Sequence, residues 1–285
     1  MMMNNTNSKK MLISPRLLTA LLGIPVVLAI VQIGAWLLAI VALLLACISL
    51  FELEKATRES STRIEGWPFY FVTFIFYALL VMNTRGLPLR EVSFYVKMVL
   101  GVFVALLVLS PLIAAILSYA TPRKVSLLSL SLSVFAGLYV SLFAFIPLLQ
   151  SQINGRALLW LTLFCVWTGD TLAYYGGRRF GKTKLTPLSP GKSREGALCG
   201  FVGSILIGAL IGHFTAIGMM HGLILGAFVG VFAPLGDLAE SFWKRELGVK
   251  DLGTILPGHG GVLDRCDSLL FAAPTVYFVA KLLGV

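Results

Sequence analysis

Residues 159–177 read LWLTLFCVWTGDTLAYYGG, an apolar run that contains a single carboxylate, Asp170. An α-helix needs about 20 predominantly apolar residues to cross the hydrocarbon core of a bilayer, and this run meets that length. A carboxylate at bilayer depth costs about 2.5–3.5 kcal/mol even on lenient insertion scales, so it is retained where it has a task. The run therefore predicts a transmembrane helix that carries a functional residue.

The rest of the chain has the same apolar character. Hydrophobic residues make up 58% and charged residues 13%, whereas charged residues are about 25% of ordinary soluble domains. This composition, with a mean hydropathy of +0.90, excludes a soluble globular protein. We expect an all-α integral membrane protein with about nine transmembrane helices, near residues 17–33, 35–51, 68–84, 95–118, 126–149, 157–176, 197–217, 220–242 and 268–284.

The distribution of basic residues predicts the orientation of these helices. Most of the 23 Lys and Arg residues fall in the N-terminal segment and in alternate loops, and cytoplasmic loops carry such an excess. The pattern predicts a cytoplasmic N-terminus and an external C-terminus. The net charge of +10 is not arranged as basic runs with interleaved stacking aromatics, so nucleic acid is not an expected partner.

The chain divides into two regions of different chemistry. Residues 1–156 contain no aspartate, and we interpret them as transmembrane helices that form a scaffold and a lipid vestibule. Residues 157–285 contain all five aspartates and all three histidines, so we expect the catalytic region there. Glu52 and Glu54 fit a functional role, but they are interpreted as residues at a helix end that face water, which usually have none.

The second region contains a polar stretch, GDLAESFWKRELGVKDLGTILPGHGGVLDRCDS, at residues 236–268, which holds four of the five aspartates. If this stretch begins as a helix, Asp237, Glu240, Ser241 and Lys244 lie on one face, at i, i+3, i+4 and i+7. One stripe then carries two carboxylates, a hydroxyl group and a cation. Such a stripe fits either a metal and phosphate site or an internally salt-bridged polar face.

A glycine-rich turn follows at residues 257–261, and its backbone N–H groups are able to approach phosphate oxygens closely. Asp264 and Asp267 come next, at a helical i, i+3 spacing that directs both carboxylates to one point. Hard divalent cations such as Mg²⁺ bind carboxylate and phosphate oxygens, and Arg265 is able to donate two hydrogen bonds to a phosphate. His259 would either donate a hydrogen bond to a phosphate oxygen or stabilise the turn.

A third group of polar residues follows Asp170 in residues 177–196. This segment contains six basic residues, several hydroxyl groups, and prolines and glycines that favour turns. It is interpreted as a loop that binds a polyanion, although a solvated basic loop on the cytoplasmic side has the same composition.

Taken together, these motifs resemble the bacterial CDP-diacylglycerol synthase (phosphatidate cytidylyltransferase) family. The family pattern is Ser-x-x-Lys-Arg, then Lys-Asp, then Pro-Gly-His-Gly-Gly-x-x-Asp-Arg-x-Asp, and upstream Asp-x-x-Ala-Tyr-x-x-Gly and Ser-Pro-x-Lys-Thr-x-Glu-Gly. The matching segments of this chain are 241–245, 250–251, 257–267, 170–177 and 189–196. Three departures are a serine at 193 in place of threonine, a gap at 187–189 one residue shorter than usual, and a leucine at 252.

The resemblance implies an enzyme that makes CDP-diacylglycerol and pyrophosphate from CTP and phosphatidic acid. It implies Mg²⁺ with a second cation of unassigned identity, a homodimer in contact with membrane lipids, and an active site at the cytoplasmic face of the bacterial inner membrane. The implied catalytic residues are Asp237, Asp264, Asp267, Lys244 and Arg265, of which the three aspartates would bind metal. The implied substrate-binding residues are Asp170, Tyr174, Ser189, Lys192, Ser193, Glu195, Glu240, Ser241, His259, Gly260 and Gly261.

Two other classes of function use the same residue types. A cation-coupled transporter also has carboxylates within the membrane, but here the carboxylates gather at one face and no two-fold repeat is visible in the sequence. A CTP-dependent lipid kinase, or a CTP-dependent cytidylyltransferase for another lipid phosphate, would use a similar site.

Overall fold

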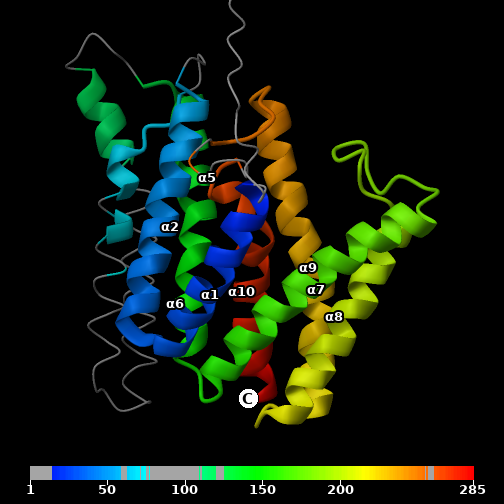
Figure 1. Ribbon diagram of the computed structural model, residues 1–285. Helices are drawn as coiled ribbons and strands as arrows, with labels where there is room; N and C mark the ends of the chain where they lie inside the picture. Colours follow the sequence, from blue (N-terminus) through cyan, green and yellow to red (C-terminus); the bar gives the residue numbers. More distant parts are fainter. Residues whose placement is uncertain are drawn as a thin grey trace, which may run out of the picture.

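The described part of the chain is helical (Figure 1). The computed structural model describes residues 15–58, 63–70, 72–74, 77, 109, 111–119, 125–253, 255 and 260–285. An isolated antiparallel bridge joins Lys184 and Ser193. The helices are α1 (Pro15–Ile33), α2 (Ala35–Ala56), α5 (Leu127–Ser141), the 3₁₀ turn η1 (Leu142–Ala144), α6 (Phe145–Gln150), α7 (Gly155–Phe180), α8 (Arg194–Phe214), α9 (Met219–Glu246) and α10 (Leu263–Leu283).

Six helical segments are long and apolar enough to cross a membrane, by length and composition. They are Trp36–Ala56, Leu127–Gln150, Gly155–Phe180, Arg194–Phe214, Met219–Glu246 and Leu263–Leu283. The prediction of an all-α membrane protein is therefore confirmed. Two expected spans, 68–84 and 95–118, lie largely outside the described residues, so the total of about nine stays a prediction, and so does the orientation.

The last helix begins earlier than the hydropathy pattern indicates. Hydropathy places the final span at 268–284, whereas α10 begins at Leu263. Its first turns therefore include Asp264 and Asp267, which a pattern of apolar residues excludes from a span. Similarly, α9 continues to Glu246 and carries the polar stripe of 237–244 on a continuous helix.

The helices form an elongated bundle in which successive segments run in alternating directions (Figure 1). Helix α9 ends and α10 begins in the upper half of the figure, and α7 ends and α8 begins at the right edge, slightly above mid-height. Helix α7 crosses the bundle obliquely, and the loop between α7 and α8 projects at the right of the figure, on the same upper side as the end of α9. Most of the polar segments singled out from the sequence are therefore collected on one side of the molecule.

Glycines allow α7, α8 and α9 to pack with their backbones close together. A Cβ atom at Gly200 of α8 would lie 2.7 Å from the carbonyl oxygen of Gly169 in α7. A Cβ atom at Gly212 would lie 2.9 Å from the Cα of Gly222 in α9. Small residues at such contacts are typical of helix pairs in membranes, where close backbone packing replaces the hydrophobic driving force. We refer to these contacts as the glycine seams.

Aromatic side chains hold α9 against α5 and α10. Trp243 of α9 stacks on Phe135 of α5 with ring centroids 5.3 Å apart, and it lies 6.3 Å from the ring of Tyr139. Tyr139 also meets Phe271 of α10 edge-on at 6.5 Å. Because large aromatic surfaces contribute strongly to packing, this cluster fixes the two helices that carry most of the carboxylates.

Candidate active site

A cavity of about 760 Å³ lies between α7, α8, α9 and α10. Its described lining combines six carboxylates with four basic side chains, and we call it the acidic cavity. The carboxylates are Asp170, Asp237, Glu240, Asp251, Asp264 and Asp267. The basic residues are Arg178, Lys192, Lys244 and Arg265. The structure thus brings together the three polar segments that are far apart in the sequence.

The centre of the cavity is a group of three carboxylates. Oxygen atoms of Asp237, Glu240 and Asp267 all lie within 4.8 Å of one another. Glu240 is 2% exposed, and its Oε1 has no hydrogen-bond partner among the described residues. A buried carboxylate oxygen without a partner is costly, and hard cations are bound by such oxygen sets. The residues present therefore fit a divalent cation.

Two features of the helices create this group. The i, i+3 spacing on α9 puts Asp237 and Glu240 on the same face, as the sequence indicates. Gly236 then allows α10 to approach, because a Cβ atom there would overlap the carbonyl oxygen of Asp267 and lie 3.1 Å from the Cα of Ser268. The close crossing at Gly236 is what brings Asp267 to the α9 carboxylates.

Asp264 lies beside this group in a different set of contacts. Lys244 Nζ lies 2.8 Å from Asp264 Oδ1 and 2.7 Å from Glu240 Oε2. The backbone N–H of Gly261 donates to Asp264 Oδ2 at 2.6 Å. The resemblance implies that Glu240 binds substrate, whereas in the structure Glu240 is the third carboxylate of the group with Asp237 and Asp267. Asp264 instead links Lys244 to the glycine-rich turn. Gly260 has a φ of +83°, a conformation that favours glycine in this turn.

The loop between α7 and α8 contributes Lys192, whose Nζ pairs with Asp237 Oδ2. The loop is closed by backbone hydrogen bonds from Leu185 N to Lys192 O at 2.8 Å and from Arg194 N to Thr183 O at 3.0 Å. It is a structured hairpin-like loop that holds a lysine against the acidic cavity.

Two predicted substrate-binding residues shape this loop. Ser193 borders the cavity, and its Oγ accepts a hydrogen bond from Gly196 N at 3.1 Å as the N-cap of α8. Glu195 accepts from Lys182 N at 3.1 Å and from Thr183 Oγ1 at 2.8 Å. The contacts that the structure gives to Ser193 and Glu195 therefore stabilise the local backbone.

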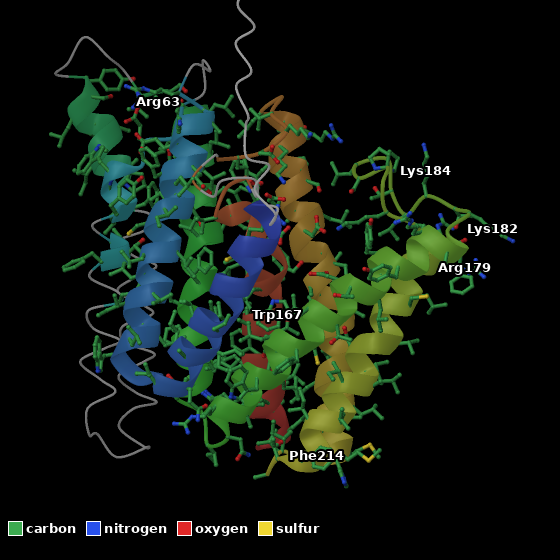
Figure 2. The ribbon with its side chains drawn as sticks, viewed as in Figure 1. Arg63, Trp167, Arg179, Lys182, Lys184 and Phe214 are labelled. Atoms are coloured by element: carbon green, nitrogen blue, oxygen red, sulfur yellow. The ribbon has the colours of Figure 1, made fainter. Side chains whose placement is uncertain are left out.

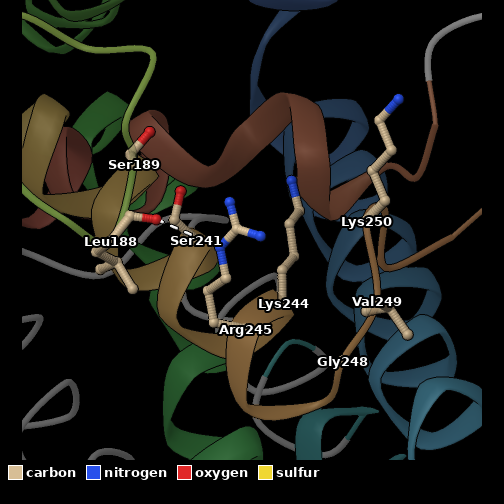
Figure 3. A pocket seen from close by; sticks show the side chains of 8 residues that line it. All are labelled: Leu188, Ser189, Ser241, Lys244, Arg245, Gly248, Val249 and Lys250. Atoms are coloured by element: carbon tan, nitrogen blue, oxygen red, sulfur yellow. Dashed lines mark hydrogen bonds between the residues drawn. The ribbon is translucent and has the colours of Figure 1, made fainter.

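Four further predicted residues line one or the other of two cavities. Tyr174 and Arg265 line the acidic cavity, and the ring of Tyr174 is exposed. Ser189 and Ser241 line a second cavity of about 360 Å³, which shares Lys244 with the first (Figure 3). His259 lies outside the described residues.

Glu52 has a structural role that the sequence interpretation left open. It was expected to face water, and this expectation is wrong because Glu52 is 1% exposed. Its carboxylate accepts hydrogen bonds from Val262 N at 2.9 Å and Leu263 N at 3.0 Å. Glu52 of α2 thus satisfies N–H groups at the start of α10, where a negative charge is also favoured by the helix dipole. Its position directly after an apolar run, before the first basic residue of the segment, is the signal that could have revealed it.

The fold and the cavity define a multi-pass α-helical membrane protein with a carboxylate and lysine site at one end. The model of the cytidylyltransferase family matches residues 14–283, and the chain belongs to this family. The family resemblance seen in the motifs is thereby confirmed.

Several curated relatives are phosphatidate cytidylyltransferases. The chain is 33% identical to the phosphatidate cytidylyltransferase of Staphylococcus epidermidis over 267 residues, which cover 91% of this chain and 95% of the relative. It is 43% identical to that of Synechocystis sp. over 129 residues, 43% of each chain. It is 45% identical to that of Helicobacter pylori over 122 residues, 41% of this chain and 44% of the relative. The last two matches span less than half the length of those relatives.

Proposed function

We propose that this protein transfers the CMP group of CTP to phosphatidic acid, which gives CDP-diacylglycerol and pyrophosphate. The observation that carries the proposal is the acidic cavity, where carboxylates and lysines from three helices and a loop meet at one end of a membrane bundle. The family and the names of the relatives support it. A lipid substrate fits such a site because its acyl chains stay in the hydrocarbon while its phosphate reaches the charged end.

The reaction needs alignment and charge neutralisation more than a strong base. An oxygen of the lipid phosphate forms a bond to the α-phosphorus of CTP, and the bond from that phosphorus to the bridging oxygen breaks. The electron pair leaves with pyrophosphate. The lipid phosphate is already an anion at neutral pH, so positioning and electrostatic stabilisation supply most of the catalysis.

The residues divide into ligands for a cation and ligands for phosphate. Asp237, Glu240 and Asp267 would hold Mg²⁺, and Asp264 and Asp170 border the same cavity as further candidate ligands, including for a second cation. A bound divalent cation neutralises charge on phosphate oxygens. Lys244, Lys192 and Arg265 would contact phosphate oxygens directly, and Asp264 holds the Lys244 ammonium group in place.

The test is turnover of labelled CTP by the purified protein in detergent micelles containing phosphatidic acid, with and without Mg²⁺. We expect a Mg²⁺-dependent nucleotidyl lipid and one pyrophosphate for each lipid formed. Release of CDP with a phosphorylated lipid would identify a kinase instead. Absence of CTP turnover under all these conditions would exclude the proposal and favour a cation-coupled transporter.

Lys192→Ala is expected to raise the KM for CTP or for phosphatidic acid by about tenfold or more, with a smaller change in kcat. A charged hydrogen bond contributes about 1.5–3 kcal/mol, and a contact made equally in the ground and transition states changes KM alone. Michaelis series in each substrate measure the effect. Lys184→Ala is the matched control, because Lys184 is an exposed lysine of the same loop and lines neither cavity. Equal KM values for the two variants would contradict a role for Lys192 in substrate binding.

We also propose that the acidic cavity opens to the cytoplasm of a bacterial inner-membrane protein with about nine helices, the N-terminus inside and the C-terminus outside. In Figure 2, Arg179, Lys182 and Lys184 lie along the right edge of the molecule, from about mid-height upward, whereas Phe214 lies at the lower end. This basic segment matches the charge pattern of cytoplasmic loops. Residues 1–156 would form the scaffold and lipid vestibule, and a homodimer is the proposed assembly.

Cysteine labelling tests this orientation in a background that lacks the four native cysteines. Thr183→Cys, in the basic loop, is expected to react with a membrane-impermeant thiol reagent only after the inner face is opened. Ile153→Cys is the matched probe in the loop between α6 and α7, which lies at the lower end of Figure 1. Ile153 is 82% exposed, and the variant is expected to react in intact cells. The reverse pattern would overturn both the orientation and the cytoplasmic placement of the cavity.

A further inference from the structure

The second cavity differs from the acidic cavity in its charge. It has a volume of about 360 Å³, and its described lining contains three cations and two hydroxyl groups but no carboxylate (Figure 3). We call it the basic pocket. It is lined by Leu188, Ser189, Ser241, Lys244, Arg245, Gly248, Val249 and Lys250. A space with this lining fits an anion that has several oxygen atoms.

The end of α9 folds so that its cations gather. Lys244 and Arg245 are in the last turn of the helix, and Gly248 follows with a φ of +65°, a conformation that favours glycine. The backbone N–H groups of Gly248 and Val249 donate to the carbonyls of Arg245 and Lys244 at 3.2 and 3.0 Å. This tight turn ends the helix and returns the chain, so that Lys250 lines the same pocket as Lys244 and Arg245, on the side of Lys244 away from Arg245 (Figure 3).

The loop between α7 and α8 closes the other side of the pocket. Arg245 Nε donates to the carbonyl oxygen of Leu188 at 3.4 Å, and the side chains of Ser189 and Ser241 lie nearby (Figure 3). The pocket is therefore formed by two separate segments, a helix end and a structured loop. Cations at a helix end that serve only to offset the helix dipole would need no such loop above them.

Two of the three cations are available to a ligand. Lys244 is engaged by Glu240 and Asp264, at 2.7 and 2.8 Å. Neither Arg245 nor Lys250 is in an ion pair with a carboxylate of the described residues. Both side chains are exposed, so they reach a ligand from solution without losing an existing ionic partner.

Lys244 lines both cavities and marks the place where they adjoin. We propose that the basic pocket binds the β- and γ-phosphates of CTP and then retains pyrophosphate, while the α-phosphate reacts at the acidic cavity. This inference rests on the proposed cytidylyl transfer. When the bond between the α-phosphorus and the bridging oxygen breaks, the electron pair and the added negative charge remain on pyrophosphate. Arg245 and Lys250 are then the cations that face this charge.

The test compares Arg245→Gln, Lys250→Gln and the double variant with the unaltered protein. We expect the double variant to raise the KM for CTP and the inhibition constant of pyrophosphate together, each by about tenfold, since charged hydrogen bonds are lost. The KM for phosphatidic acid is expected to stay within about twofold, because in the proposal the lipid phosphate does not enter the basic pocket. Lys182→Gln is the control. Lys182 is an exposed residue of the loop between α7 and α8, and it lines neither cavity.

Three results would overturn the inference. The first is an unchanged KM for CTP in the double variant. The second is a rise in the KM for phosphatidic acid alone, which would assign the pocket to the lipid phosphate. The third is an equal rise in the KM for CTP in Lys182→Gln, which would mean that CTP responds to the general surface charge and not to the basic pocket.

Failure of the proposed function is distinguished from failure of the pocket inference by the unaltered protein. If the proposed function is wrong, the unaltered protein forms no nucleotidyl lipid. The pocket is still tested in that case by binding of pyrophosphate alone, measured by calorimetry on the purified protein. Weaker binding by the double variant than by Lys182→Gln would support the anion site. Equal binding by the two variants would overturn it.

Discussion

Asp237→Asn is expected to lower kcat at least about a hundredfold, which corresponds to about 2.7 kcal/mol of barrier. Asp237 belongs to the group of three carboxylates and also pairs with Lys192. Asparagine has almost the same volume, but it lacks the charge and presents one ligand oxygen in place of two. The change therefore removes cation binding while leaving the packing of α9 intact.

Two measurements separate this effect from unfolding. Binding of Mn²⁺ in place of Mg²⁺, followed by electron paramagnetic resonance, is expected to weaken, while the thermal unfolding midpoint in detergent stays close to that of the unaltered protein. Glu246→Gln is the control, because Glu246 is an exposed carboxylate on the same helix and lines neither cavity. If Asp237→Asn keeps more than about a tenth of kcat, a barrier change below about 1.4 kcal/mol, Asp237 is not a ligand of the reacting centre.

Glu52→Gln is expected to give the second largest loss, at least about tenfold in kcat together with a lower unfolding midpoint. The two oxygens of Glu52 accept from the backbone N–H groups of Val262 and Leu263. A glutamine offers one acceptor and one donor group, so one buried N–H would face another donor, at a cost of about 1–3 kcal/mol. The start of α10 would shift, and Asp264 and Asp267 would shift with it.

A positioning role for Glu52 predicts more than a loss of stability. At a temperature well below the unfolding midpoint, kcat should remain low and binding of Mn²⁺ should be weaker, because the carboxylates of α10 are displaced. Glu54→Gln is the matched control two residues away, since Glu54 pairs with Arg63 at 3.3 Å outside both cavities. If Glu52→Gln has full kcat at low temperature, Glu52 stabilises the fold without positioning the site.

The helices of this protein could be predicted because lipid imposes a simple requirement on the sequence. Backbone groups in the hydrocarbon must bond within the segment, so each long apolar run such as 157–176 becomes a helix. The start of α10 could not be located in this way. Asp264 and Asp267 are polar, and they are helical because Glu52, which lies more than two hundred positions earlier, accepts from the N–H groups at the start of this helix.

The sequence could predict those parts of the candidate site that depend only on the spacing of residues along one helix. Asp237 and Glu240 share a helix face, and their separation along α9 follows from helical geometry alone. The pairing of Lys192 with Asp237 depends on how the loop folds across α9, and the close position of Asp267 depends on the glycine at 236. Such contacts between distant segments are decided by tertiary packing, which a single sequence does not specify.

The glycine seams have a consequence for the interpretation of random mutagenesis. Any side chain at Gly200 or Gly212 would meet the backbone of a neighbouring helix, so substitutions there separate α7, α8 and α9 and abolish activity without touching a ligand. A map of inactivating substitutions would therefore contain two superimposed patterns, one around the carboxylates and one along the helix contacts. Only the amount of folded protein in the membrane distinguishes them, which makes expression level the necessary companion of every activity score.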